Sequence, residues 1–396
     1  MKNDQSISIV VIILLVATLG QVASDLYLPS LPSIAIKLNI NTSWIQMTLA
    51  IYMAGYSLSQ LIYGPLSDAI GRRIPLIIGL SIAFIGGMVC YLSLEIHYLL
   101  IGRFLQGLGA GAGTSLARPI LRDLFEKEKL AVYNSYLAIS SVFILSAAPV
   151  LGGYIEQFLG WRYNFLFLSL YSFITLCFFY AKVSETNQHH CRDNLKLSKI
   201  INNIGCLFKS PVFLKFSLCL VLTYAGILAW LTAAPIVLQE KVGLTPVQFG
   251  WIYIFSGLGF ALGGIINANY VTKFGINTMI NFGFLCQFSA GLLMLLFYLL
   301  GYMNVYVIVT PIAIFMCGSS LVYPNSSAGA LTPFPKIAET AGAIFGFMQI
   351  LGGALSSSTI ALVHHKSQLP IAIAFLITSL ISILIFYILS MKKPTN

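Results

Sequence analysis

Long apolar runs separated by short polar connections extend over nearly the whole chain. A helix that crosses the hydrocarbon core of a membrane needs about 20 apolar residues. The pattern predicts twelve such helices, at roughly residues 7–28, 44–66, 74–94, 98–118, 131–154, 163–182, 212–237, 247–268, 276–299, 303–326, 339–363 and 369–391. We therefore expect an all-α membrane protein.

One polar connection is much longer than the others. Residues 184–211 carry several Lys and Arg residues and separate six predicted helices from the next six. Two halves of six helices are typical of transporters built from an internal repeat. We expect an N-terminal six-helix bundle at 1–183, a cytoplasmic linker loop at 184–211 and a C-terminal six-helix bundle at 212–396.

The composition excludes several other classes of protein. Hydrophobic residues make up 58% of the chain and charged residues only 9%, against about 25% charged residues in an ordinary soluble domain. So few charges cannot cover a water-soluble surface. A soluble enzyme, a disordered chain and a small secreted protein are therefore excluded.

The net charge of +10 would suggest a nucleic-acid partner, but the positions of the charges do not. If the N-terminus is cytoplasmic, 17 of the 22 Lys and Arg residues fall on the cytoplasmic side and Arg103 falls inside a span. The remaining four lie outside: Lys37, Arg162, Lys241 and Lys366. Basic residues in cytoplasmic loops orient membrane proteins. We expect both termini in the cytoplasm and no nucleic-acid partner.

The first apolar run has two interpretations. Lys2, the run itself and Gln21-Val22-Ala23 resemble a secretory signal peptide with a cleavage site. The run is long for a signal, however, and it leads directly into Asp25 and Tyr27. We expect an uncleaved first helix.

Cysteine and histidine do not suggest a metal site. The seven cysteines lie mostly within predicted spans and form no C-x-x-C pair, so apolar packing is their expected role. The pairs His189-His190 and His364-His365 each lie beside the end of a span. We expect no metal, no cofactor and no disulfide framework.

Asp25 and Arg103 are charged residues well inside predicted spans. Asp25 lies near the outer end of the first helix and Arg103 near the outer end of the fourth, at similar depth for a rise of about 1.5 Å per residue. An arginine in a span costs at least a few kcal/mol, so it should face a polar interior with a partner. The two residues form either a static buried ion pair or a site with a proton-binding carboxylate. Ionisable residues in spans mark ion and substrate pathways, which favours the second interpretation.

The connection between the second and third predicted helices has a distinctive order of residues. It reads Gly64-Pro65-Leu66-Ser67-Asp68-Ala69-Ile70-Gly71-Arg72-Arg73, and its glycines allow a tight turn. This order resembles the signature loop of the major facilitator superfamily. The resemblance implies a latch between the two halves, formed by Gly64, Asp68, Gly71, Arg72 and Arg73.

Two further helices resemble the same superfamily. Arg103-x-x-Gln106-Gly107-x-Gly109 in the fourth helix is similar to its proton-coupled members. The glycines also match a dinucleotide fingerprint, but no strand precedes them, and small residues in a span instead let helices approach closely. Pro149-x-x-Gly152-Gly153 in the fifth helix is similar to the superfamily's antiporter motif, which favours export over uptake.

Two stretches resemble one branch of the superfamily. Asp25-Leu26-Tyr27-Leu28-Pro29-Ser30-Leu31-Pro32 is similar to the D-x-Y-L-P-x-L-P stretch of the bicyclomycin-resistance (Bcr/CflA) drug-export family. Arg118-Pro119-Ile120-Leu121-Arg122-Asp123 is similar to its R-A-x-x-R-D stretch, with Pro119 in place of Ala. The resemblance implies a monomeric drug:proton antiporter of a bacterial inner membrane, whose partners are a small-molecule substrate and protons.

These observations predict a transporter that exports a small amphipathic molecule by alternating access. Asp25 would carry the proton, and movement of Arg103 would change its proton affinity between states. Substrate-cavity candidates are Tyr27, Tyr52, Tyr56, Gln106, Arg118, Asn134, Tyr136 and Gln349. The alternatives are a proton-linked nutrient symporter and, in another class, a transport-dead sensor or assembly partner. A membrane enzyme is disfavoured, because the spans show no paired carboxylates or nucleophile motif.

Overall fold

The computed structural model describes residues 3–187, 197–363 and 367–391, so the two histidine pairs lie outside the described residues. Within these residues, twelve helices have 20 or more residues: α1 (Asn3–Asp25), α3 (Thr42–Ile70), α4 (Arg73–Leu92), α5 (Ile96–Leu124), α6 (Lys127–Phe158), α7 (Trp161–Lys182), α9 (Pro211–Ile236), α10 (Pro246–Phe274), α11 (Ile276–Leu299), α12 (Val305–Leu331), α13 (Ala338–Leu362) and α14 (Leu369–Met391). The predicted all-α architecture of twelve long helices is confirmed.

The shorter elements connect the long helices. They are η1 (Leu28–Ser30), α2 (Leu31–Lys37), α8 (Leu197–Lys209), the π-helical turn η3 (Val237–Lys241) and η4 (Pro335–Ile337). The first span is longer than predicted, because η1 and α2 continue the apolar stretch of α1 to Lys37. The linker range contains α8, so it is not only a loop.

Ten helices of the described part are long and apolar enough to cross a membrane by length and composition. α3 and α5 are equally long but less apolar. Their buried faces include Gln46 and Gln60 in α3, and Arg103 and Gln106 in α5. Polar side chains on a spanning helix must face the protein interior, so α3 and α5 form the polar centre of the N-terminal half.

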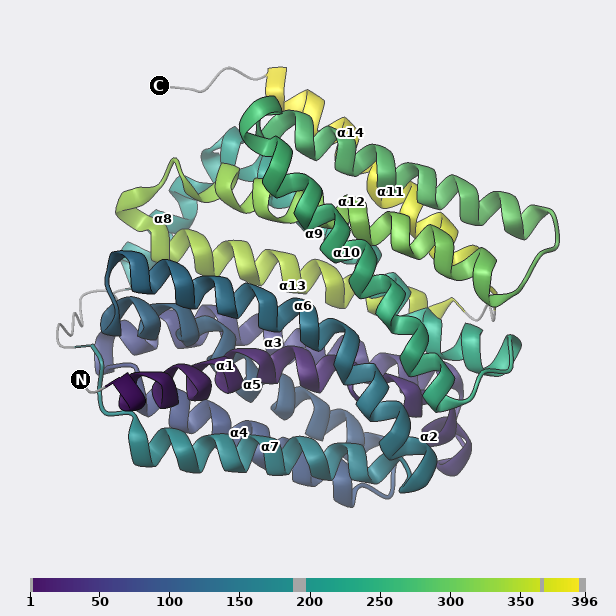
Figure 1. The fold of residues 1–396 in the computed structure, drawn as a ribbon, viewed down its shortest axis with the longest axis horizontal. Helices are drawn as coiled ribbons and strands as arrows, with labels where there is room; N and C mark the ends of the chain where they lie inside the picture. The colour runs from purple at the N-terminus through teal and green to yellow at the C-terminus, as the bar shows by residue number, and fades with distance from the viewer. Residues whose placement is uncertain (1–2, 188–196, 364–366, 392–396) are drawn as a thin grey trace.

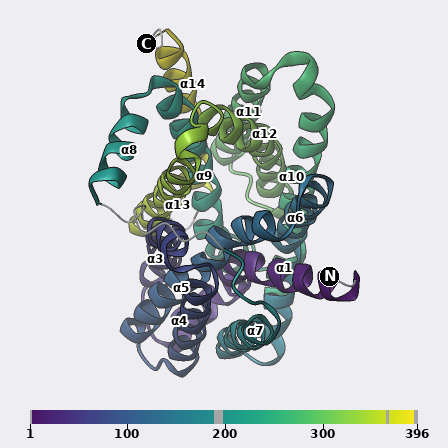
Figure 2. The same ribbon diagram turned by 90° about the vertical axis from the view of Figure 1, so that its left-hand side faces the viewer.

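The long helices form two bundles, α1 and α3–α7 in one and α9–α14 in the other (Figure 1). The most extensive contacts between the bundles are those of α3 with α13 and of α6 with α10. Figure 2 shows the bundles from the end that carries α8, one above the other. The turn after α3 in the first bundle and the turn after α10 in the second have the same feature. Each contains a glycine with positive φ, Gly71 at 97° and Gly275 at 79°.

The hydrophobic core differs between the two ends of the molecule. At the end that carries α2, one cluster contains buried residues of both bundles, such as Leu28 and Leu49 with Leu228 and Trp230. At the end that carries α8, the buried clusters belong to separate bundles. Figure 1 shows α6 and α10 diverging toward that end. The bundles therefore share a buried apolar core at the α2 end, whereas at the α8 end each bundle has its own buried core.

The signature stretch is mostly helical, contrary to the expectation of a glycine-rich loop. α3 continues to Ile70, so Gly64 and Pro65 lie inside it. The turn forms at Gly71, whose φ of 97° is accessible to glycine and costly for other residues. Nothing lies within 4 Å of where a Cβ on Gly64 would be, so close packing does not explain that glycine.

We predict opposite effects for substitutions at these two glycines. Gly71→Val should destabilise the protein by roughly 1–2 kcal/mol, because a Cβ is strained at this φ and would also meet the Glu185 carboxylate. Gly64→Ala, the matched control, should be neutral or stabilising by up to about 1 kcal/mol, since alanine favours a helix interior. Thermal unfolding in the same detergent measures both. Equal destabilisation by the two variants would contradict this assignment.

Candidate functional site

The first span is broken immediately after Asp25, and two prolines explain why. Proline has no N–H and its ring clashes with the carbonyl four residues earlier. Pro29 therefore cannot donate a helical hydrogen bond to the Asp25 carbonyl, and Pro32 cannot donate one to the Leu28 carbonyl. α1 ends at Asp25, and the chain resumes as η1 and α2. The carbonyls of the last turn of α1 consequently need other hydrogen-bond donors.

Asp25 is buried at this helix end. Its residue is 2% exposed, and its Oδ1 accepts a hydrogen bond from the Ser24 hydroxyl at 2.6 Å. Arg103 and the tyrosines Tyr52 and Tyr253 lie close enough to interact with it electrostatically. Tyr253 belongs to the second bundle, so Asp25 faces groups of both halves.

Arg103 of α5 is completely buried between two aromatic rings. Its guanidinium carbon lies 4.1 Å from the ring centroid of Tyr27 and 4.1 Å from that of Tyr52. Nη1 donates to the Ala23 carbonyl at 2.9 Å and to Gln106 Oε1 at 2.5 Å. The cation thus occupies the C-terminal end of α1, where the helix dipole and the unpaired carbonyls favour positive charge.

Asp25 and Arg103 do not form an ion pair in this conformation. The ion pairs among the described residues are Arg72 with Asp68 and Asp123, and Arg122 with Glu339. Arg103 Nε and Nη2 have no hydrogen-bond partner in the described part of the chain. Two of the three guanidinium nitrogens therefore have no acceptor for their N–H groups.

Close packing of α3 against α5 places the tyrosine rings. A side chain at Gly107 would collide with the Tyr52 carbonyl, so glycine is needed for this approach. The Tyr52 hydroxyl donates to the Gly20 carbonyl at 2.6 Å, which fixes its ring over Arg103. Tyr56 stacks beside Tyr52 with ring centroids 5.9 Å apart, and its hydroxyl is hydrogen-bonded to Thr114.

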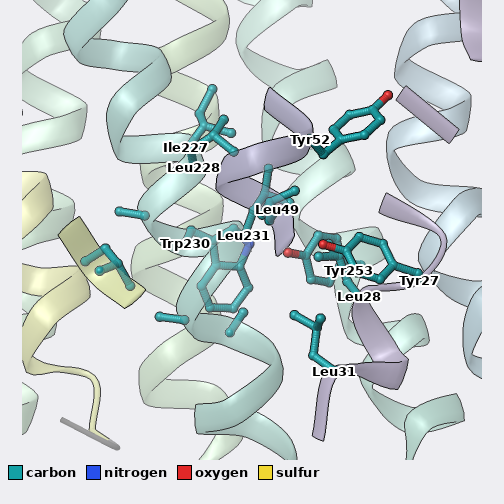
Figure 3. Packing of buried hydrophobic residues seen from close by; sticks show 14 of the residues in the cluster. Tyr27, Leu28, Leu31, Leu49, Tyr52, Ile227, Leu228, Trp230, Leu231 and Tyr253 are labelled. Carbon is teal, nitrogen blue, oxygen red and sulfur yellow. The ribbon is translucent and has the colours of Figure 1, made fainter. Parts of the chain in front are cut away.

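The second bundle presents aromatic residues to this site. Trp230 of α9 and Tyr253 of α10 stack with ring centroids 5.8 Å apart. Figure 3 shows them in one packed cluster with Tyr27 and Leu28 of the first bundle. Within the described residues, Trp230 Nε1 and the Tyr253 hydroxyl have no hydrogen-bond partner. In the sequence, these two residues have no feature that distinguishes them from aromatic residues of the apolar core.

The other predicted cavity residues do not all join this site. Gln349 of α13 is buried and donates to the Tyr323 hydroxyl at 3.3 Å. Arg118 is exposed and lies about 22 Å along α5 from Arg103, at 1.5 Å per residue. Asn134 and Tyr136 are exposed on the half of α6 that diverges from α10. Arg118, Asn134 and Tyr136 therefore lie outside the buried site in this conformation.

The predicted latch is a network centred on Arg72. The guanidinium pairs with Asp68 and with Asp123 of α5, the latter at 3.3 Å, and donates to the Ser67 hydroxyl at 2.6 Å. Arg73 instead donates to the Tyr180 carbonyl at 2.9 Å. The network ties the turn after α3 to α5 and α7, and Asp68 also interacts with Glu339 of α13 in the second bundle.

Glu185 completes this turn and was not predicted, because it is 113 residues away from Arg72 in sequence. Its carboxylate accepts from the backbone N–H groups of Arg72 at 2.8 Å and Arg73 at 3.1 Å, and so caps the N-terminus of α4. Burial alone would raise the pKa of Glu185. The backbone hydrogen bonds outweigh burial and hold the pKa below its ordinary value of 4.5.

One exposed ion pair joins the bundles near the α8 end. Arg122 Nη2 lies 2.7 Å from Glu339 Oε1, and both side chains are about half exposed. Exposed pairs contribute about 0–1 kcal/mol. This contact can therefore form and break at small free-energy cost.

The predicted antiporter motif lies where three elements meet. A side chain at Gly152 would collide with the Leu26 carbonyl at the break of the first span. One at Gly153 would collide with the Pro246 carbonyl of α10, and Gly250 of α10 packs against Pro149 in the same way. The glycines of this motif therefore let α6 touch both the broken span and the second bundle.

No metal site is found in the described part of the chain, where no group of three or more His, Cys, Asp or Glu residues is placed to hold an ion. The chemistry that the site offers is binding and release. It combines one buried carboxylate, one buried guanidinium with free N–H groups, and several aromatic faces.

We predict that the Tyr27 ring matters more than its hydroxyl. Tyr27→Leu should lower the free energy of unfolding by roughly 2 kcal/mol, because a desolvated cation loses one of its two aromatic faces. Tyr27→Phe keeps the ring and loses only the hydrogen bond to Thr48 at 3.1 Å, so it should cost about 1 kcal/mol. Thermal unfolding compares the variants. A larger loss for Phe than for Leu would refute the stacking argument.

We predict that the Glu185 cap is lost in acid. Because the pKa of this group is lower in the folded chain, its contribution is complete above its ordinary value of 4.5 and disappears as the pH falls through the lowered value. Glu185→Gln should therefore lower the unfolding temperature at neutral pH. The difference from the parent should vanish in acid, and a difference that grew there would reverse the assignment.

Comparison with known proteins places the chain in a family. The sequence matches the Major Facilitator Superfamily over residues 13–361. It is 28% identical to multidrug resistance protein D of Escherichia coli, covering 97% of this chain and 96% of the relative. It is also 28% identical to a bicyclomycin resistance protein homolog of Haemophilus influenzae, covering 93% and 92%.

Solved structures agree on the fold. A D-xylose-proton symporter superposes with a TM-score of 0.74 at 17% identity, covering 95% of this chain and 97% of the other. A peptide transporter does so with a TM-score of 0.77 at 13% identity, covering 96% and 94%. Two bundles of six helices, the signature turn and the match over most of the sequence lead to one conclusion: the chain belongs to the major facilitator superfamily of transport proteins.

Proposed function

We propose that this transporter is a proton-coupled antiporter that exports a small amphipathic molecule across a bacterial inner membrane. It works as a monomer with both termini in the cytoplasm. The observation that carries the proposal is the buried Asp25 carboxylate, which lies beside the unpaired Arg103 guanidinium at a break in a spanning helix. A carboxylate in this place can exchange a proton while its surroundings move.

The distribution of basic residues supports a cytoplasmic position for the α8 end. The core that both bundles share then lies at the outer end, and the separate cores lie at the inner end. The conformation is thus inward-facing, closed to the outside. An exporter loads its substrate from the cytoplasm in this state.

Asp25 and Arg103 provide the coupling. When the outer ends separate, Asp25 takes a proton from outside. When the inner ends separate, the proton leaves to the cytoplasm and the substrate enters. Arg103 has two nitrogens whose N–H groups are free for the carboxylate, so a small movement of α5 against α1 changes how strongly the deprotonated form is stabilised. Exchange becomes obligatory because proton and substrate occupy the site in turn.

The lining of the site supports an amphipathic substrate. Aromatic rings provide apolar faces on both bundles, from Tyr52 and Tyr56 on one side to Trp230 on the other. Ligand sites commonly combine such faces with a few polar groups. Three relatives carry the names multidrug, bicyclomycin and chloramphenicol resistance protein. Those names, together with the motif in α6, favour export of such compounds over uptake.

Asp25→Asn should abolish driven export while leaving the fold intact, because asparagine is nearly isosteric but cannot carry a proton. Inverted membrane vesicles with an acidified lumen and a pH-sensitive dye provide the measurement. Compounds of the bicyclomycin and phenicol classes should trigger proton release with the parent protein and only background release with the variant. Glu95→Gln, an exposed carboxylate at the outer end of α5, is the matched control and should behave as the parent.

Normal compound-triggered proton release by a correctly folded Asp25→Asn protein would rule out Asp25 as the coupling residue. Accumulation rather than depletion of labelled compound in cells would instead favour the uptake symporter.

A further inference from the structure

A second buried carboxylate lies at the outer end of the molecule. Glu156 is 9% exposed, in the last turn of α6. The predicted helix ended at residue 154, which left Glu156 in a polar connection where an exposed acid is unremarkable. The structure instead extends α6 to Phe158 and turns this side chain onto the broken first span.

The contacts of Glu156 all lead to the segment that follows the break. Its Oε1 accepts a hydrogen bond from the Ser33 hydroxyl of α2 at 2.6 Å. The Ser30 hydroxyl also lies close enough to stabilise the carboxylate as a hydrogen-bond donor. Lys37, in the last turn of α2, attracts the carboxylate electrostatically. Its Oε2 has no hydrogen-bond partner among the described residues. An ionised carboxylate buried with so few partners is costly, and this cost would disappear on protonation.

An uncharged residue near Glu156 also forms a hydrogen bond to the segment that follows the break. Asn164 of α7 donates from Nδ2 to the Ser30 hydroxyl at 2.8 Å and to the Gly152 carbonyl at 3.3 Å. α6, α7 and the segment Leu28–Lys37 are thus joined through polar groups inside an otherwise apolar core.

The segment Leu28–Lys37 bridges the two bundles. Its elements η1 and α2 contact α9, and η1 also contacts α10. Leu28, Leu31 and Ile34 are fully buried in the core that both bundles share. Whatever holds this segment against α6 therefore also holds the outer end of the molecule closed.

We propose that Glu156 is a second proton-binding site, which controls the opening of the outer end. In its ionised form it accepts a charge-assisted hydrogen bond from Ser33 and attracts Lys37, which keeps Leu28–Lys37 in place. A proton taken from the outer aqueous phase neutralises the carboxylate. The hydrogen bond then loses about half its strength and the attraction to Lys37 is lost, so the segment leaves α6 and the outer ends separate.

The proton on Glu156 returns to the outer phase when that end closes again. It is therefore a gating proton and adds nothing to the number of protons moved across the membrane. This inference rests on the alternating-access cycle proposed above, but not on Asp25 being the coupling residue.

Hydrogen–deuterium exchange of the full-length protein in lipid nanodiscs tests the proposal. As the buffer changes from alkaline to mildly acidic, peptides that cover Leu28–Lys37 should exchange faster by roughly tenfold after correction for intrinsic rates, as expected for the loss of a charge-assisted hydrogen bond. Peptides from the inner half of α6 should become more protected in the same step. Glu156→Gln should exchange at the fast rate at every pH, and Glu95→Gln should keep the response of the parent.

The same measurement in an Asp25→Asn background separates the two proposals. A response that persists there belongs to Glu156, whatever the outcome of the transport assay. A response that disappears with Asp25→Asn but survives in Glu156→Gln would overturn the assignment of Glu156. So would identical exchange by the parent and Glu156→Gln at every pH, because Glu156 would then be a structural hydrogen-bond acceptor only.

Ser33→Ala provides a second test if Glu156→Gln fails to fold. It removes the donor and leaves the carboxylate, so the segment should exchange faster at alkaline pH and respond less to acid. An unchanged response in this variant would also overturn the proposal.

Discussion

A buried arginine without an ion-pair partner is the constraint around which the first bundle is built. Removing a guanidinium from water is expensive, and a membrane interior offers no solvent to repay the cost. The chain supplies two aromatic faces, the Gln106 side chain and the carbonyl of Ala23. That carbonyl is available only because α1 ends two residues later, at Asp25. The proline-induced break in the first span and the buried cation are therefore parts of one arrangement.

The broken span also connects Asp25, Glu156 and the interface between the bundles. On its inner side, Asp25 terminates α1 beside Arg103. On its outer side, Ser33 contacts Glu156, and Leu26 lies directly against Gly152 of α6. Movement of the short segment after the break would therefore reach both carboxylates and the bundle interface. Short unwound segments at mid-membrane depth have this use in other transporters, because a broken helix can move one half without the other.

The inner end is held in a different way. The bundles meet there through the half-exposed pair Arg122–Glu339, while the buried Arg72 guanidinium pairs with Asp68 and Asp123 at the turn after α3. Charged contacts that are half exposed exchange readily for water. The outer end has a dry, shared apolar core instead. The two ends therefore close by different physical means.

The architecture follows from the apolar pattern of the chain, since the length of each apolar run is set by the thickness of the membrane and needs no knowledge of neighbours. Helix count, the two halves, the buried Asp25 and Arg103, and the signature turn all follow from such local patterns. The fold, by contrast, establishes that Asp25 and Arg103 form no ion pair, that Asn134 and Tyr136 are exposed, and that Glu156 is buried. It alone brought Glu185 to α4 and Glu339 to Arg122, across 113 and 217 residues. These pairings depend on how helices rotate and pack against one another, which a periodic apolar pattern does not encode.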